Sequence, residues 1–141
     1  MKVVLLAGGI GSRLSEETYL KPKPLVEIGN MPMIWHIMMI YSHYGYNEFI
    51  ICCGYKGYML KEFFANYFLH LSDVEIDVKN SSVKILNKKL KKNWKITLID
   101  TGEKTQTGGR IKKIRKYIDD TFLMTYGDGL SNVNINKLLH F

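Results

Sequence analysis

The sequence has little cysteine and little proline. Only 2 of its 141 residues are cysteine and 3 are proline. The 2 cysteines, Cys52 and Cys53, are adjacent inside an apolar run, where neighbouring strand side chains point to opposite faces and a mutual disulfide is strained. We therefore expect two reduced core residues. No histidine-bearing motif accompanies them, which argues against a catalytic thiol.

Long apolar runs are also absent. The run after Lys2 is too short for a signal peptide, and no other run approaches the ~20 residues of a membrane span. A chain of 141 residues lies within the usual range for one domain. We expect a soluble, cytoplasmic protein with a single domain and no membrane partner.

Acidic residues are missing from residues 79–95, which contain seven lysines. Residues 1–75 carry 6 basic and 7 acidic side chains (−1), whereas residues 76–141 carry 14 and 6 (+8), so the net charge of +7 belongs to the second half. Only Trp94 offers stacking there. A solvated or subunit-contacting loop is therefore favoured over a nucleic-acid surface.

A glycine-rich loop follows the first apolar run. Residues 3–7 are uninterrupted Val, Leu and Ala, which predicts a buried parallel strand with a ligand site beyond its carboxyl end. Gly8, Gly9 and Gly11 would leave backbone N–H groups free to hold phosphate oxygens, with Ser12 adding a hydroxyl and Arg13 a forked cation. A turn that needs glycine for steric reasons is the alternative.

Two common phosphate motifs are excluded by spacing. Position 14 is leucine, where a dinucleotide fingerprint needs glycine, and no Gly-Lys-Ser/Thr triplet occurs. The loop is thus a phosphate loop of another type. Lys21 and Lys23 lie in the stiff run Lys21-Pro22-Lys23-Pro24. Judged by spacing alone, either lysine could supply a further cation to the phosphate site.

Strand-like and helix-like segments alternate along the chain. We expect strands at 3–7, 49–53, 95–100 and 122–126, and helices at 32–44, 57–71, 110–117 and from 134. This order predicts an α/β fold with a doubly wound, mostly parallel Rossmann-like sheet. Residues near 74–95 alternate differently and predict a β-hairpin insertion. The aromatic stripe of helix 57–71 is expected to be core.

Asp128 lies between Gly127 and Gly129, directly after the last expected strand. It should face the same crevice as the glycine loop, where a carboxylate beside phosphate oxygens is the usual ligand of Mg²⁺. A plain Asp-Gly turn is the alternative. His36 and His43 share a helix face without a third ligand, so we expect structural roles for them.

Several ordered motifs resemble those of the sugar-1-phosphate nucleotidylyltransferases. They are Leu6 to Leu14, Lys21 to Pro24, Ile51 to Gly57, Thr107-Gly108-Gly109-Arg110 and Tyr126-Gly127-Asp128-Gly129. The resemblance runs from the first residue to the last. It implies transfer of a cytidylyl group from CTP to α-D-glucose 1-phosphate, giving CDP-glucose for deoxysugar synthesis. Such chemistry depends on positioning and charge neutralisation.

The resemblance also implies roles for single residues. Leu6, Ala7, Gly8 and Gly9 would line the cytosine and ribose, and Gly11, Ser12 and Arg13 would hold the triphosphate. Arg13 would stabilise the leaving pyrophosphate and Lys23 the reacting α-phosphate, so these two are the catalytic candidates. Thr105 and Arg110 would close over the nucleotide, and Asp128 would ligate Mg²⁺. Ser12 stands where the family more often has threonine.

Members of this family are nearly twice as long as this chain. The resemblance implies that residues 1–141 are the nucleotide-binding part of a truncated domain, and that most of the sugar pocket and a second aspartate for Mg²⁺ lie elsewhere. Because the family commonly assembles, we expect a homo-oligomer. A non-catalytic nucleotide-binding or partner-binding module and a related thymidylyltransferase are the alternatives.

Overall fold

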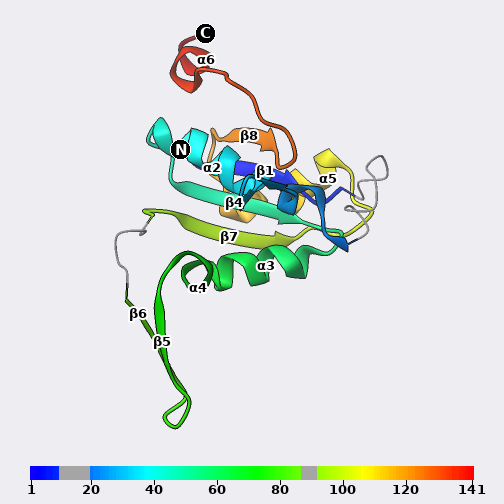
Figure 1. The fold of residues 1–141 in the computed structure, drawn as a ribbon. Coiled ribbons are helices and arrows are strands. Elements are labelled where there is room, and N and C mark those ends of the chain that lie inside the picture. Colours follow the sequence, from blue (N-terminus) through cyan, green and yellow to red (C-terminus); the bar gives the residue numbers. More distant parts are fainter. Residues whose placement is uncertain (10–19, 87–91) are drawn as a thin grey trace.

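A four-stranded parallel sheet forms the centre of the molecule (Figure 1). The computed structural model describes residues 1–9, 20–86 and 92–141. Its strands, in spatial order, are β7 (Lys95–Asp100), β4 (Glu48–Cys53), β1 (Val3–Ala7) and β8 (Leu123–Tyr126). Gly11, Ser12 and Arg13 lie outside the described residues.

The side chains of β1 alternate between two hydrophobic cores. Val3 and Leu5 pack with Ile34 and Met38 of helix α2 (Met33–His43) on one face of the sheet. Val4 and Leu6 pack on the other face, in the core that holds Ile114, the residue that ends helix α5 (Thr107–Lys113). A strand covered on both faces reads as a continuous apolar run, which is why β1 could be predicted.

The strand order reverses direction at β1. The chain runs from β1 through α2 to β4, then through α3 (Gly57–Ala65) and α4 (Tyr67–Leu71) to β7. It returns through α5 and the short helix η3 (Arg115–Tyr117) to place β8 on the other side of β1. This confirms the doubly wound fold, and it creates a crevice beyond the carboxyl ends of β1 and β8.

Short elements complete the chain. Between β1 and α2 lie the one-turn helix η1 (Lys23–Leu25) and a small antiparallel pair, β2 (Glu27–Ile28) and β3 (Met31–Pro32). Helix α6 (Ile135–His140) follows β8 and begins with a side-chain cap, because Asn134 Oδ1 accepts a hydrogen bond from the Lys137 amide. In the described part of the chain, no helix has the length and apolar character needed to cross a membrane.

Two helices differ from the sequence prediction. The expected helix 57–71 is interrupted at Asn66, so that α3 and α4 are separate. Helix α5 begins at Thr107 and therefore includes Gly108 and Gly109, which disfavour helix by propensity. Tertiary hydrogen bonds made by Arg110, described below, fix this segment and outweigh the propensity.

The aromatic stripe is only partly core. Leu60 and Tyr67 are buried, and the Tyr67 hydroxyl accepts a hydrogen bond of 2.9 Å from Trp35 Nε1. Phe68, by contrast, is exposed on α4. The periodicity therefore identified the helical face correctly, but Phe68 lies outside the core, because the described part of the chain leaves it exposed.

Cys52 and Cys53 are both buried and free, as expected. Their side chains enter different cores, Cys53 with Leu5 and Cys52 with Val4. Desolvation by burial raises the pKa of Cys52 to about 11 and that of Cys53 to about 12. Both thiols stay protonated at neutral pH and lack the thiolate that nucleophilic chemistry requires.

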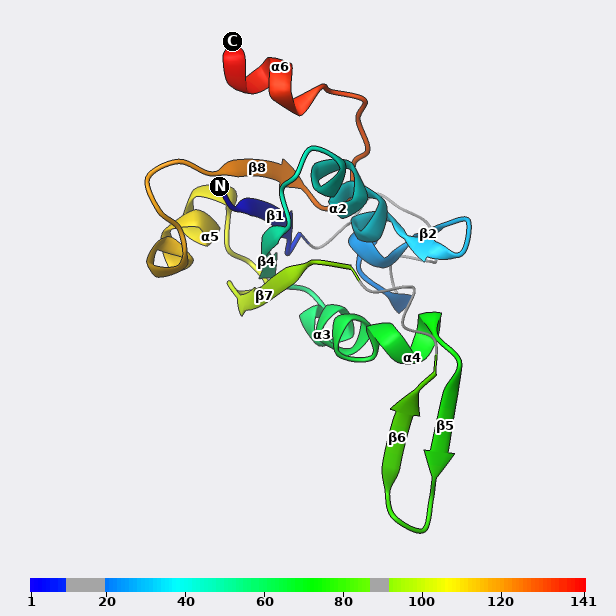
Figure 2. The same ribbon diagram turned by 90° about the vertical axis from the view of Figure 1, so that its left-hand side faces the viewer.

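The predicted insertion is a two-stranded antiparallel hairpin, made of β5 (Val74–Asp77) and β6 (Ser82–Ile85). It projects away from the sheet and its helices in both ribbon views (Figures 1 and 2). The hairpin is shorter than the expected 74–95, because Lys95 already belongs to β7 of the central sheet.

Candidate functional site

A cavity of about 250 Å³ lies at the carboxyl ends of β1 and β8. Eight residues that were predicted from the sequence to bind the nucleotide or Mg²⁺ line this cavity: Leu6, Ala7, Gly8, Gly9, Lys23, Thr105, Arg110 and Asp128. They come from four separate segments of the chain, which the parallel sheet brings to one edge. The cavity is thus the candidate functional site.

Arg110 forms the floor of this site and is only 5% exposed. Its Nη2 donates to the carbonyl of Gly8 at 2.8 Å and to that of Glu103 at 3.3 Å. Its Nη1 donates to Thr101 Oγ1 at 2.7 Å, to the Gly102 carbonyl at 2.8 Å and to the Cys53 carbonyl at 3.3 Å. Among the described residues no carboxylate pairs with it, so carbonyl and hydroxyl dipoles compensate the buried charge.

These hydrogen bonds join the segments after three strands. Gly8 follows β1, Cys53 ends β4, and Thr101 and Gly102 follow β7. Thr101 adds two bonds of its own to the Cys53 carbonyl, from its backbone amide at 2.9 Å and from its hydroxyl at 2.8 Å. The site edge of the sheet is therefore a connected hydrogen-bond network centred on one guanidinium.

Two glycines are required where this network is most crowded. A Cβ atom on Gly8 would overlap the Arg110 guanidinium, and one on Gly54 would overlap the Gly8 carbonyl. At Gly9, in contrast, no described residue other than its chain neighbours has an atom within 4 Å of the ideal Cβ position. The steric explanation of the glycine loop thus holds at Gly8, whereas Gly9 leaves open backbone beside the cavity.

Lys23 and Asp128 both line the cavity and form an ion pair, with Nζ and Oδ2 separated by 4.0 Å. Lys23 is positioned by η1, between the buried residues Pro22 and Pro24. Asp128 follows the turn at Gly127, whose amide donates to the Leu6 carbonyl at 2.9 Å. The two side chains are 24% and 37% exposed, so both charges are accessible to a ligand.

Thr105 belongs to a braced loop. Lys113, on α5, donates from Nζ to the Thr101 carbonyl at 2.8 Å and to Thr105 Oγ1 at 3.4 Å. Ile111 and Ile114 are the apolar positions of this helix, so helical periodicity places Lys113 on the outer face and does not predict this contact. Nothing in the local pattern signals it, because the partners are supplied by the loop that follows β7.

Four other residues line the cavity but were not predicted as site residues: Pro24, Gln106, Thr107 and Tyr126. Tyr126 directly precedes Gly127 and Asp128, and its ring is 60% exposed at the end of β8. Its position at the end of a strand, next to the predicted metal ligand Asp128, could have identified Tyr126 as a site residue from the sequence. Gln106 and Thr107 begin α5, which the sequence predicted to start later.

A metal cage of protein ligands is not present in the described part of the chain, where no group of three His, Cys, Asp or Glu side chains gathers. Asp128 alone fits Mg²⁺ in another way, because Mg²⁺ is commonly held by one or two carboxylates together with substrate phosphates. His36 has the expected structural role, since its Nε2 donates to the Ile28 carbonyl at 2.8 Å.

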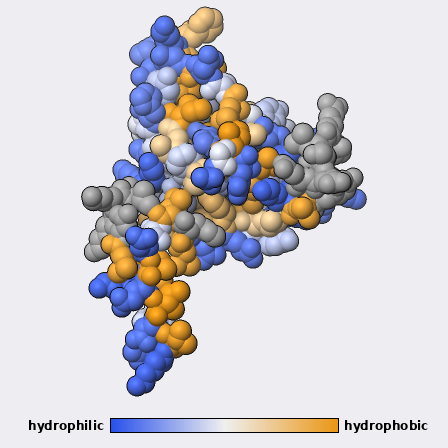
Figure 3. All heavy atoms as spheres, viewed as in Figure 1, coloured by the Kyte–Doolittle hydropathy of each residue, from blue (hydrophilic) through white to orange (hydrophobic). Residues whose placement is uncertain are grey.

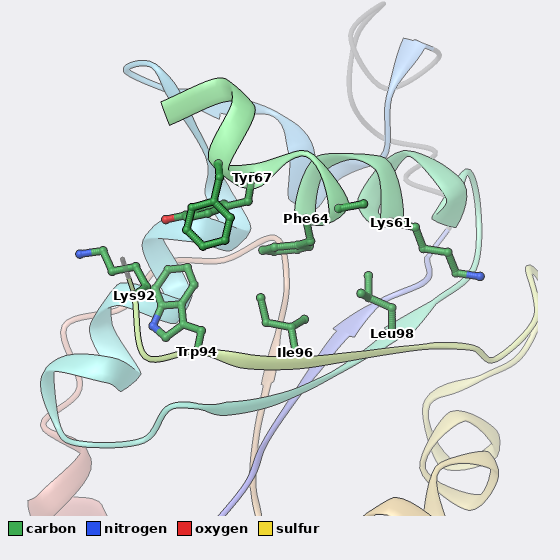
Figure 4. Close-up of a pocket in the computed structure, with 9 residues that line it drawn as sticks. Lys61, Phe64, Tyr67, Lys92, Trp94, Ile96 and Leu98 are labelled. Carbon is green, nitrogen blue, oxygen red and sulfur yellow. The ribbon is translucent and has the colours of Figure 1, made fainter. Parts of the chain in front are cut away.

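A second cavity, of about 450 Å³, lies between β7 and the helices α3 and α4 (Figure 4). Phe64, Tyr67, Trp94, Ile96 and Leu98 point into it from these elements. Lys61 and Lys92 stand at its margins. Because aromatic and aliphatic side chains dominate its wall, it has no convergent set of charged groups like that around Gly8 and Asp128.

The fold and the first cavity together define a class of protein. A doubly wound parallel sheet, a glycine turn after β1 and charged groups at the switch point are typical of nucleotide-binding α/β domains. A cation and a carboxylate side by side in the cavity, Lys23 and Asp128, further suit a metal-bound phosphate ligand.

Comparison with known proteins agrees with this class. The family model described as nucleotidyl transferase matches residues 2–140, and the chain belongs to that family. The chain is 52% identical over its full length to glucose-1-phosphate cytidylyltransferase of Salmonella typhimurium, covering 55% of that protein. It is 47% identical to the probable glucose-1-phosphate cytidylyltransferase of Bacillus subtilis, with the same coverage.

A solved structure supports the fold independently. HddC from Yersinia pseudotuberculosis, complexed with GMP-PN, matches 99% of this chain and 52% of its own length, with a TM-score of 0.68 and 26% identity. The chain thus spans about half the length of the relatives it matches.

Proposed function

We propose that this chain is the nucleotide-binding part of an enzyme that transfers a cytidylyl group from CTP to α-D-glucose 1-phosphate. The products would be CDP-glucose and pyrophosphate. The main support for the proposal is that eight residues predicted from the sequence to bind the nucleotide or Mg²⁺ line one cavity. The identities of 52% and 47% to proteins named for this reaction support the choice of nucleotide and sugar.

The reaction is a displacement at the α-phosphorus of CTP. A phosphate oxygen of the sugar phosphate forms the new P–O bond, and the bond to the pyrophosphate oxygen breaks. Negative charge grows on the leaving group, so fixed cations and positioning supply the catalysis. Lys23 would neutralise the α-phosphate, while Gly11, Ser12 and Arg13 would hold the remaining phosphates.

Asp128 would hold Mg²⁺ next to Lys23. When bound there, the ion supplies charge neutralisation for the phosphate oxygens. Lys23 and Asp128 pair at 4.0 Å and both remain partly exposed, so an ion on Asp128 would lie close to the phosphate that Lys23 contacts. The base and ribose would lie along Leu6 to Gly9, with Thr105 and Arg110 lining the same cavity.

The sugar phosphate would be bound mainly by residues outside this chain. The chain spans about half the length of these relatives, and the cavity described above is assigned in this proposal to the nucleotide. We propose that the protein also self-associates. CTP binding by this chain is thus the direct test, because turnover would also need a complete sugar-phosphate site.

Titration calorimetry of the 141-residue chain with CTP, UTP, TTP and GTP, each with Mg²⁺, tests the nucleotide assignment. We expect CTP to bind at least about 10-fold more tightly than the others, equivalent to about 1.4 kcal/mol. Equal affinity for all four would contradict cytidylyl specificity, and preference for TTP would indicate a thymidylyltransferase. Tyr58→Ala, exposed on α3 and outside the site, provides a control variant.

A further inference from the structure

The β5–β6 hairpin has one aliphatic and one polar face. Ile76 lies directly opposite Val83, and Val74 opposite Ile85, so these four side chains share a face. Val78 is the first residue of the turn after β5 and adds an exposed aliphatic side chain at the tip of the hairpin. We call these five residues the aliphatic face.

The other face carries the charges. Glu75 lies opposite Lys84, and Asp77 opposite Ser82. Asp77 accepts hydrogen bonds from Asn80, at 2.7 Å from the side chain and 3.2 Å from the backbone amide, which lower the pKa of Asp77 and fix the turn. The polar face is therefore well solvated by water. The aliphatic face, in contrast, would gain stability if a partner covered it.

The described part of the chain leaves the aliphatic face open. Ile76, Val78 and Val83 are 61%, 83% and 54% exposed. Figure 3 shows apolar residues along the hairpin, which stands clear of the body in every view. A two-stranded hairpin is at best marginally stable in water, and an exposed Val/Ile strand pair is prone to associate. The alternation of the sequence thus builds a docking surface.

We propose that the aliphatic face binds the same face of a second copy of this chain, with the two hairpins antiparallel. The face has no charged or hydrogen-bonding side chain, so an identical face complements it and the charged faces remain in water. The hairpin projects far enough for two of them to overlap without contact between the bodies.

The base of the hairpin extends this surface. Leu86, whose amide donates to the Asp73 carbonyl at 2.8 Å, and Phe68 and Leu69 of α4 are also exposed. Antiparallel overlap places Val78 of each copy near the base of the other. Burying Ile76, Val78, Val83 and these three residues in both copies covers on the order of 1,000 Å², about what a specific interface needs. The hairpins alone would cover about half of that.

This inference rests on the proposed self-association and names its surface, but it does not depend on nucleotide chemistry. Sedimentation velocity of the full chain between about 1 and 100 μM tests it. We expect wild type to exceed the monomer mass of 16.3 kDa. The variant Ile76→Glu/Val83→Glu should sediment as a monomer, with at least about 100-fold weaker association, because it buries two unpaired charges.

Lys84→Glu is the matched control, because it changes the net charge by the same amount on the polar face. It should associate like wild type. A monomeric wild type at all concentrations would overturn the inference. So would unchanged association of the double variant, or equal loss in the control. Association should also strengthen with salt, since each copy carries a net charge of +7.

A cross-linking experiment guards against simple unfolding of the hairpin. Cys52 and Cys53 are buried, so a short bis-maleimide reads out a single added thiol. Ile76→Cys should give covalent dimers efficiently, whereas its neighbour Glu75→Cys, on the polar face, should not. Equal yields would overturn the assignment of the face. CTP affinity of the double variant separates the two proposals, because it should equal that of wild type.

Discussion

The guanidinium of Arg110 donates a hydrogen bond of 2.8 Å to the carbonyl of Gly8, a residue 102 positions away in the sequence. This contact fixes the glycine turn after β1 to the helix that follows β7. A planar guanidinium suits the task, because it directs several donors into the surrounding carbonyls at once.

Arg110→Ala should therefore destabilise the fold and weaken CTP binding together. Five carbonyl and hydroxyl acceptors lose their donor, and we expect a loss of about 2 to 4 kcal/mol in the free energy of unfolding. Arg110→Lys keeps the positive charge but loses the planar guanidinium with its several donors, so it should recover only part of the stability. Urea denaturation measures the first effect and calorimetry the second. Lys112→Ala, exposed on the same helix, should change neither. An Arg110→Ala chain as stable as wild type would contradict the role of the network.

Gly8→Ala and Gly9→Ala form a matched pair. The added methyl group at Gly8 would overlap the Arg110 guanidinium, so this variant should lose about 2 kcal/mol or more of stability. At Gly9 the methyl group meets no atom of another described segment within 4 Å, so Gly9→Ala should fold like wild type. Thermal unfolding distinguishes them. Because the open backbone at Gly9 faces the cavity, Gly9→Ala should weaken CTP binding without loss of stability. Equal melting temperatures for the two variants would refute the steric assignment at Gly8.

Asp128→Asn should reduce the dependence of CTP binding on Mg²⁺. The amide keeps the shape of the side chain but removes the charge that would hold the cation. We expect the gain in CTP affinity on adding Mg²⁺ to fall by roughly 10-fold, measured by calorimetry across a Mg²⁺ series. Asp120→Asn, on the exposed loop before β8, is the control. If Asp128→Asn kept the full Mg²⁺ response, the carboxylate would not be the metal ligand.

Arg13→Ala tests the triphosphate assignment made from the sequence. Removing a cation that contacts phosphate should weaken CTP binding about 10- to 100-fold, since charge-assisted hydrogen bonds are worth about 1.5–3 kcal/mol. CMP, which lacks the β- and γ-phosphates, should bind the variant and wild type alike. In the longer protein we expect Arg13→Ala to abolish transfer. A wild-type affinity for CTP would show that the residue was misassigned.

The buried thiols predict a dependence of stability on alkaline pH. Folding raises the pKa of Cys52 from 9.0 to about 11 and that of Cys53 from 9.0 to about 12. Their contribution is fully present below pH 9 and is lost as pH rises toward 11 to 12, because the unfolded thiols ionise first. The free energy of unfolding should thus fall more steeply above pH 9 in wild type than in Cys52→Ala/Cys53→Ala. Parallel curves for the two proteins would contradict burial of the thiols.

The sequence by itself determined the sheet and the location of the site. Residues 3–7 and 49–53 are continuous apolar runs because both faces of these strands are covered, and their ends carry glycine in the chain. Parallel strands of a doubly wound sheet present their carboxyl ends at one edge. The turn after residue 7 and Asp128 were therefore predicted to meet before any distance was known.

Only the tertiary structure decided how that edge is held together. Arg110 was nominated as a nucleotide contact, and nothing in Thr107-Gly108-Gly109-Arg110 indicates that its donors end on the carbonyls of Gly8, Cys53 and Gly102. Lys113 was likewise placed outward by helical periodicity, although it braces the loop at Thr105. Periodicity reports which face of an element is apolar. It does not report long-range partners of polar side chains, because those partners are set by the packing of segments distant in the sequence.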